Sequence, residues 1–159
     1  MTWLTGIFKK RKNTEQNGLN RIFLTNTLSG VKELFVSQRP GIVTMYSCGP
    51  TVYSQQHIGN LRPGILADTL ARLFAYAGYH VRRVINITDV GHMVGDGDQG
   101  EDKVGATATR EKATPEAIAS RYAKLFIEDL ESLNIDVGNI LFPRATEYIK
   151  EQIALATLL

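Results

Sequence analysis

The chain has 159 residues, of which 43% are hydrophobic, and a formal net charge of +2 at pH 7. This length and composition predict one soluble globular domain, and the mild charge lacks the concentrated basic character of a typical nucleic-acid binder. No apolar run approaches the roughly 18 residues that span a bilayer, and a single cysteine excludes an internal disulfide framework.

The first 21 residues are polar and basic around Lys9, Lys10, Arg11 and Lys12. We expect residues 1–21 to form a flexible tail, and a solvated terminus is favoured over an RNA-binding arm. The basic cluster follows a short apolar piece, which is the reverse of a secretory signal. The start of the sequence therefore predicts a cytoplasmic protein.

Residues 22–159 are expected to form an α/β domain. A β-rich opening from Ile22 leads to a short buried strand over 42–46, a helix over 65–77 and a second strand over 81–87 that is rich in β-branched residues. A strand, helix and strand of these lengths predict a parallel pair with a right-handed crossover. This is the beginning of a Rossmann-like parallel sheet with flanking helices.

The second half of the chain is expected to contain a loop and two helices. Residues 91–105 are rich in glycine and acidic residues without any period, and a solvated flexible loop is favoured over a calcium-binding loop because the spacing is not that of an EF-hand. Thr114 and Pro115 then have the residue types of an N-cap and first helical position, which predicts a helix to about residue 133. A further helix is predicted from near Ala145 onward.

The segment from Met45 to Asn60 carries the chemistry that the sequence suggests. A thiol, a Gly-Pro turn and the tetrapeptide His-Ile-Gly-Asn lie where a strand gives way to a helix, and the N-terminus of a helix suits the phosphates of ATP. If Ile58 opens the helix, His57 and Asn60 both face those phosphates, and Gly59 offers a bare surface for an adenine ring. The predicted ATP-binding set is Gly49, His57, Gly59 and Asn60, with His57 and Asn60 in catalytic positions.

These residues resemble a known family. Cys-Gly-Pro-Thr-Val-Tyr at 48–53, His-Ile-Gly-Asn at 57–60 and Asn-Ile-Thr-Asp at 86–89 look like active-site segments of the class I cysteinyl-tRNA synthetases, whose fold belongs to the HIGH-type nucleotidyl-transferase superfamily. The resemblance runs from about Ile22 to about Ile149. It implies attack of the cysteine carboxylate on the α-phosphorus of ATP, with Mg²⁺, followed by transfer of the cysteinyl group to tRNA(Cys). The family usually ends its tetrapeptide in His, so Asn60 keeps a donor but carries no charge.

The resemblance also implies roles for the residues around this motif. From its residue type alone, Cys48 could be a nucleophile, a buried small residue or a metal ligand. The resemblance implies that it is a zinc ligand together with a cysteine, a histidine and a glutamate from downstream, and that the zinc binds the substrate thiolate. None of those downstream ligands is identifiable in this sequence. Thr51, Tyr53 and Thr88 are the predicted cysteine-binding residues. Asp89 either anchors the substrate amine or caps the turn that follows it, and the cap is slightly favoured.

The chain is expected to be an incomplete synthetase, inactive by itself. Members of the resembled family are roughly three times longer, and their Lys-Met-Ser-Lys-Ser loop has no counterpart here. Another chain or segment would then supply the missing half. The alternatives are a ligase of the same superfamily that joins cysteine to an amino-sugar, a small nucleotidyltransferase, and a non-catalytic nucleotide-binding half-protein that needs a partner chain.

Overall fold

The computed structural model describes residues 21–90 and 103–159, which separate at Pro40 into two compact units. The expected tail lies almost wholly outside the described residues, as does most of the predicted acidic loop. The elements in chain order are β1 (Phe23–Thr25), β2 (Lys32–Leu34), β3 (Ile42–Ser47), α1 (Ile58–Tyr76), β4 (His80–Ile85), α2 (Lys103–Glu111), α3 (Pro115–Ser132), η1 (Val137–Asn139), β5 (Ile140–Leu141), η2 (Ala145–Tyr148) and α4 (Ile149–Leu158).

The first unit contains an antiparallel hairpin, in agreement with the predicted β-rich opening. Strands β1 and β2 pair with Phe23 opposite Leu34 and Thr25 opposite Lys32. Asn26 begins the turn between them, because its side-chain oxygen accepts a hydrogen bond from the backbone N–H of Leu28 at 3.0 Å.

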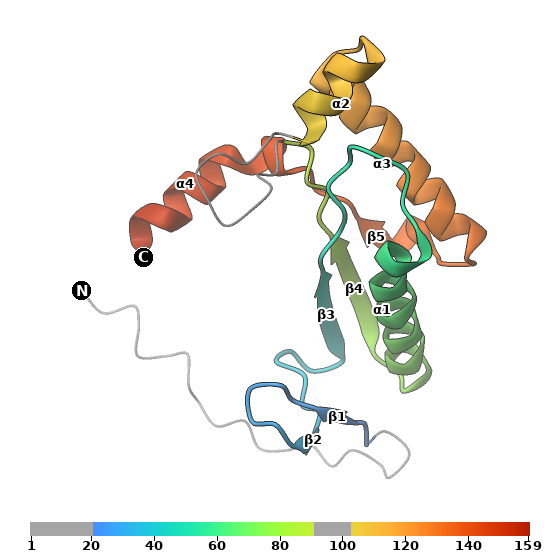
Figure 1. The fold of residues 1–159 in the computed structure, drawn as a ribbon. Helices are drawn as coiled ribbons and strands as arrows, with labels where there is room; N and C mark the ends of the chain where they lie inside the picture. Colours follow the sequence, from blue (N-terminus) through green and yellow to red (C-terminus); the bar gives the residue numbers. More distant parts are fainter. Residues whose placement is uncertain (1–20, 91–102) are drawn as a thin grey trace. The chain divides into compact units, whose positions relative to one another are not determined.

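The second unit is a three-stranded parallel sheet in the order β3-β4-β5 (Figure 1). Ile42 pairs with His80 and Ser47 with Ile85, so β3 and β4 are in register over their whole length, while β5 pairs with the middle of β4. The predicted parallel pair is therefore confirmed. Successive crossovers of one hand that advance in one direction place their helices on the same face of the sheet. Helices α1 and α3 follow this rule.

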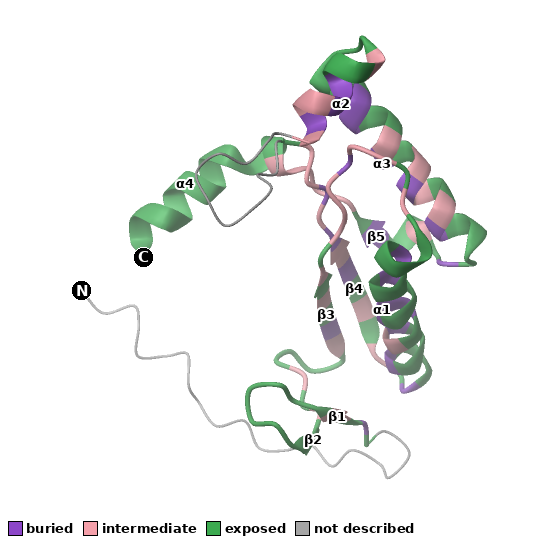
Figure 2. Cartoon of the chain, in the orientation of Figure 1, coloured by how far each residue is buried: buried purple, intermediate pink, exposed green. Residues whose placement is uncertain are grey.

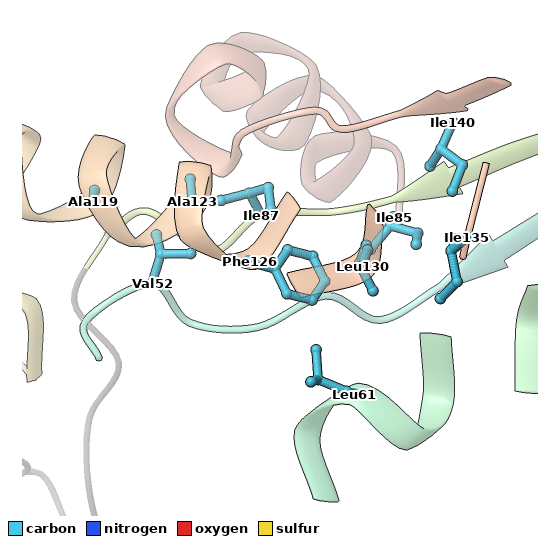
Figure 3. Packing of buried hydrophobic residues seen from close by; sticks show 10 residues of the cluster. All are labelled: Val52, Leu61, Ile85, Ile87, Ala119, Ala123, Phe126, Leu130, Ile135 and Ile140. Carbon is cyan, nitrogen blue, oxygen red and sulfur yellow. The ribbon is translucent and has the colours of Figure 1, made fainter. Parts of the chain in front are cut away.

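The hydrophobic core lies between that face and the two helices (Figure 3). Ile85 of β4 and Ile140 of β5 meet Leu61 of α1 and Phe126 and Leu130 of α3. On the opposite face, among the described residues, Tyr46 keeps 71% of its surface exposed and Leu141 keeps 70%, and every residue of α4 is exposed (Figure 2). Parallel sheets are usually covered on both faces, so this half of the architecture is Rossmann-like but partial.

A buried ion pair fixes α1 on the sheet. Asp68, 7% exposed, accepts hydrogen bonds from Arg83 of β4 at 2.7 Å and from Arg72 at 2.6 Å. Arg72 also donates to the carbonyl oxygen of Asn134 at 2.5 Å. The network therefore joins α1, β4 and the turn that follows α3.

Three predicted boundaries and one omitted strand require correction. Strand β4 runs over His80–Ile85 rather than over 81–87. Helix α1 begins at Ile58 rather than at 65, because the side chain of His57 caps it and Pro63 is tolerated inside its second turn, where the chain is exposed. Residues 103–105 belong to helix α2, not to the loop. The short strand β5 was not predicted, since its two residues have no periodicity that distinguishes them from a loop.

Helix α2 was missed because its apolar face is narrow and contains Gly105. Its buried side chains are Val104, Thr107 and Ala108, and Val104 and Ala108 pack on Ile118 of α3. A hydrogen bond from Arg121 of α3 holds the pKa of Glu111, at the end of α2, below its usual value. Apolar packing and an ion pair thus join the two helices.

The two later helices agree with the sequence prediction. Helix α3 begins after Thr114, whose hydroxyl oxygen accepts the N–H of Ala117 at 3.2 Å, and it ends at Ser132. The last helix begins with a 3₁₀ turn at Ala145 and continues as α4. Among the described residues, no helix combines the length and the apolar character that a membrane crossing would need.

Candidate functional site

The site is built on the loop that joins β3 to α1. Figure 1 shows this loop leaving the carboxyl end of β3, passing beyond the end of the strand and returning to the first turn of α1. In parallel sheets, ligands usually bind at this edge. All of the predicted site residues lie on the loop, on the first turn of α1, or just after β4.

His57 and Asn60 form a capping box at the start of α1. The Nδ1 atom of His57 accepts the backbone N–H of Gly59 at 3.1 Å, and the side-chain oxygen of Asn60 accepts the backbone N–H of His57 at 3.3 Å. Because Nδ1 is an acceptor, the neutral imidazole carries its proton on Nε2. The Nε2–H group and the amide NH₂ of Asn60 remain as donors beside the positive end of the helix dipole, and both residues are exposed.

Gly59 leaves room for the His57 ring beside the start of the helix. A Cβ atom at position 59 would lie 2.9 Å from Cε1 of His57 and 3.1 Å from Nδ1, so a side chain there would push the ring away from the helix. The sequence suggested that Gly59 provides a bare surface for adenine. The structure gives this glycine a local reason that applies with or without a nucleotide.

Gly49 is required by the close approach of two chain segments. A Cβ atom at this position would lie 1.7 Å from the carbonyl oxygen of Asn86, which is far inside van der Waals contact. The N–H of Gly49 also donates to the side-chain oxygen of Asn86 at 3.0 Å. These contacts place Gly49 beside the end of β4, and its predicted ATP contact stays a prediction.

Thr51 and Thr88 are brought side by side. They form an isolated parallel bridge that prolongs the sheet beyond β3 and β4. Thr88 donates its N–H to the carbonyl oxygen of Pro50, and Val52 donates to the carbonyl oxygen of Thr88, each at 3.1 Å. Both threonines of the predicted cysteine site are partly exposed.

Tyr53 has a different environment. Its ring packs against the Val104, Ala108 and Ile118 cluster, and the Nζ atom of Lys103 lies 5.2 Å from the ring centroid. This contact places a cation of α2 next to the loop. No role for Lys103 was predicted from the sequence, since this residue follows an acidic stretch and its neighbour in space, Tyr53, lies far away along the chain.

Cys48 is exposed, and its thiol donates to the carbonyl oxygen of Gly49 at 3.5 Å. Within residues 21–90 and 103–159, no three His, Cys, Asp or Glu side chains gather in a way that would hold a metal ion. The described part of the chain therefore does not assemble a zinc site, and Cys48 offers one possible ligand.

Asp89 binds a segment far along the chain, and residues 91–102, where the following turn would lie, are outside the described residues. Its two carboxylate oxygens accept the N–H of Thr146 at 3.1 Å and the hydroxyl of Thr146 at 2.6 Å, at the start of η2. Next to it, Ile87 donates to the carbonyl oxygen of Pro143 at 2.8 Å and accepts from Ala145 at 3.0 Å. The segment that follows β4 is thus held between the site loop on one side and residues 143–146 on the other.

Two hollows among the described residues lie away from this loop. One has a volume of about 470 Å³ and is lined by Arg72, Glu131 and residues 134–138, and a neighbouring one is lined by Ile65, Asp68 and residues 133–135 among others. Neither contains a predicted site residue.

Comparison with known proteins identifies the family to which the chain belongs. A family model described as "tRNA synthetases class I (C) catalytic domain" matches residues 34–159. The chain is 45% identical over 134 residues to "Cysteine--tRNA ligase" of Chlorobium chlorochromatii, a match that covers 84% of this chain and 28% of the relative. It is 44% identical over 134 residues to "Cysteine--tRNA ligase" of Deinococcus radiodurans, which covers 84% of this chain and 27% of the relative. It is 46% identical over 131 residues to "Cysteine--tRNA ligase 1" of Burkholderia lata, covering 82% of this chain and 28% of the relative. The chain thus spans between a quarter and a third of the length of these relatives.

Proposed function

Because the chain belongs to the family of class I tRNA synthetase (C) catalytic domains, we propose that it carries part of the site where ATP activates cysteine for attachment to tRNA(Cys). The names of the similar proteins support cysteine and tRNA as substrates. They favour this function over the joining of cysteine to an amino-sugar. A cytoplasmic location, suggested by the start of the sequence, is part of the same proposal.

The observation that carries the proposal is the capping box at the start of α1. His57 and Asn60 use one side-chain atom each to complete the helix terminus, and this leaves the imidazole Nε2–H and an amide NH₂ as donors at the positive end of the helix dipole. Such a group of donors suits the polyphosphate of ATP. Gly49 and Gly59 contribute by allowing the backbone and the ring to take these places.

The reaction needs alignment more than a protein nucleophile. An oxygen of the cysteine carboxylate forms a bond to the α-phosphorus of ATP, and the bond from that phosphorus to the pyrophosphate oxygen breaks, which gives cysteinyl-adenylate and pyrophosphate. Donors from His57 and Asn60 would stabilise the charge that accumulates on the phosphate oxygens. Thr51 and Thr88, adjacent at the ends of β3 and β4, would orient the amino acid. A hydroxyl oxygen at the 3′ end of the tRNA then forms a bond to the cysteinyl carbonyl carbon, and the bond from that carbon to AMP breaks and releases AMP.

Mg²⁺ and zinc belong to the proposal in different ways. Mg²⁺ would accompany ATP and neutralise phosphate charge. Cys48 would be one of several zinc ligands, and zinc would then favour the substrate thiolate over a serine hydroxyl. Residues other than those described would complete the ligand set, since the described residues do not gather three ligands.

A second candidate is a half-site that works with another chain or segment. The exposed side chains Tyr46 and Leu141 on the uncovered face of the sheet, and the exposed Ile149, Ile153 and Leu158 of α4, support this candidate, because large apolar side chains in such numbers usually mark a surface that something covers. It differs from the first candidate only in which polypeptide completes the site. This second candidate includes the case in which the chain binds a nucleotide and does not itself catalyse the reaction.

Calorimetric titration of the chain with Mg·ATP tests the phosphate assignment. We expect weak binding that His57→Ala reduces. Because His57 also caps α1, His57→Asn serves as a second variant, since asparagine is a good N-cap but lacks the imidazole. His80→Ala is the matched control, because His80 is exposed at the opposite end of β4. Equal affinity in wild type and both His57 variants would refute the phosphate role.

Exchange of labelled pyrophosphate into ATP tests the need for a complement. We expect no cysteine-dependent exchange by the pure 159-residue chain, and exchange when the remaining part of a homologous synthetase is added. In that mixture, zinc measured by atomic absorption should approach one per complex and should fall markedly with Cys48→Ser. Robust exchange by the pure chain would contradict the half-site proposal, and equal zinc in both mixtures would remove Cys48 from the ligand set.

A further inference from the structure

Three polar contacts from different parts of the site converge on the side chain of Asn86, the first residue after β4. Its Oδ1 atom accepts the backbone N–H of Gly49 at 3.0 Å and the hydroxyl of Tyr46 at 2.9 Å. Its Nδ2 atom faces the hydroxyl oxygen of Thr88 at 3.4 Å. Because a backbone N–H is only a donor, the atom that faces Gly49 must be the amide oxygen, and this fixes Nδ2 on the side of Thr88.

The backbone of Asn86 makes this approach unusually close. A Cβ atom on Gly49 would lie 1.7 Å from the Asn86 carbonyl oxygen and 2.9 Å from its carbonyl carbon. The loop residue next to Cys48 is thus pressed against the end of β4 by its backbone and held there by the side chain of the same asparagine. Thr88 and the loop are also joined by the two backbone hydrogen bonds around the Thr51–Thr88 bridge.

We infer that Asn86 is a positioning residue that fixes the Cys48–Thr51 loop and the Thr88 hydroxyl as one unit. The inference rests on the proposed function, which places substrate groups at Cys48, Thr51 and Thr88. Since the oxygen of Thr88 accepts a hydrogen bond from Asn86, its own proton is available to an oxygen atom of the bound amino acid. Asn86 thereby sets both where the loop lies and in which direction the Thr88 hydroxyl donates.

Asparagine is suited to this task because one planar group has both an acceptor and a donor. In Asn86→Asp, one carboxylate oxygen would still accept from Gly49 and Tyr46, but the other would accept the Thr88 proton and reverse that hydrogen bond. In Asn86→Leu, both functions would be lost. The two variants therefore separate the holding of the loop from the orientation of the hydroxyl.

The loop function is read from hydrogen exchange of the Gly49 amide in ¹⁵N-labelled chain. Asn86→Leu should speed exchange roughly five- to tenfold, the effect expected for loss of one net-stabilising hydrogen bond. Asn86→Asp should change it less than about threefold, and so should the control Tyr46→Phe, which removes another contact of the same Oδ1 atom. Gly49 exchange that is the same in Asn86→Leu and wild type would overturn the inference.

The hydroxyl function is read from titration with L-cysteine in the same spectra. Asn86→Asp should weaken binding by about the same factor as Thr88→Val, roughly five- to tenfold, and the double variant should be no weaker than either single variant. Factors that multiply in the double variant would overturn the role of Asn86 in orienting Thr88. If wild type shows no shifts with L-cysteine, the proposed cysteine site of this chain fails, while Gly49 exchange still decides whether Asn86 holds the loop.

Discussion

Replacing Asp68 by alanine is expected to destabilise the chain by about 3 to 5 kcal/mol. Asp68 and its partner Arg83 are each 7% exposed, and the two are joined at 2.7 Å. Nη2 of Arg83 has no hydrogen-bond partner among the described residues. Without the carboxylate, Arg83 becomes an uncompensated buried charge. The cost of that desolvation, more than the lost attraction, sets the magnitude.

Two comparisons isolate the buried charge as the cause. Arg72 pairs with the same carboxylate, but its side chain is 57% exposed, so Arg72→Ala should cost about 1 kcal/mol or less. Asp68→Ala combined with Arg83→Met removes both charges and keeps an unbranched apolar side chain in place. This double variant should be more stable than Asp68→Ala alone.

Urea unfolding followed by far-ultraviolet circular dichroism measures these differences. A lower midpoint at constant slope would report a loss of stability without a change in the surface exposed on unfolding. The reasoning fails if Asp68→Ala costs less than about 1 kcal/mol, or if the double variant is less stable than the single one. Either result would mean that Arg83 reaches solvent or another partner once the carboxylate is gone.

Three further outcomes are expected from the described contacts. Gly49→Ala should prevent the loop from docking at Asn86, because the new methyl group would meet the carbonyl oxygen, and the Gly49-to-Asn86 contact should vanish from nuclear Overhauser spectra while the helical circular dichroism persists. Thr114→Ala should lower stability in urea by about 1 kcal/mol through loss of the α3 cap, and Thr114→Ser should restore it. The hydrogen bond from Arg121 holds the pKa of Glu111 below its usual value. This ion pair therefore stabilises the contact between α2 and α3 fully above the unfolded pKa of Glu111, about 4.3. The stabilisation is lost as the pH falls through the lower pKa of the folded state. Glu111→Gln should abolish this acid-dependent part in urea titrations at pH 6 and pH 3, and an unchanged pH dependence would contradict it.

The sequence was most informative where a local rule and a long-range arrangement agree. The strand over 42–46 and the helix after Thr114 have clear periodicity and capping residues, and the structure contains both. The parallel pairing of β3 with β4 followed from the length of the crossover. The loop with His57 and Asn60 lies at the predicted edge of the sheet because strand ends and helix starts are local features.

The remaining features depend on contacts that a single sequence does not reveal. Helix α1 begins at Ile58 because the His57 side chain caps it, and histidine is not among the residues that usually indicate an N-cap. Strand β5 has only two residues and exists because β4 offers an edge. Asn86 follows a strand end, a position that favours functional side chains, but its contact with Gly49 joins residues that lie 37 positions apart.

The pairing of Asp89 with Thr146 has a consequence for synthesis of the chain. These partners are 57 residues apart, so at roughly 5 to 20 residues per second the ribosome needs about 3 to 11 s to make the second after the first. During that interval the residues after β4 lack the strand-like neighbour that Pro143 and Ala145 later provide. Strands β3 and β4 and the connecting helix can associate early, because their contacts are nearer in sequence. The edge of the sheet that carries the predicted substrate residues is therefore completed last, as the segment from 143 to 146 emerges and docks.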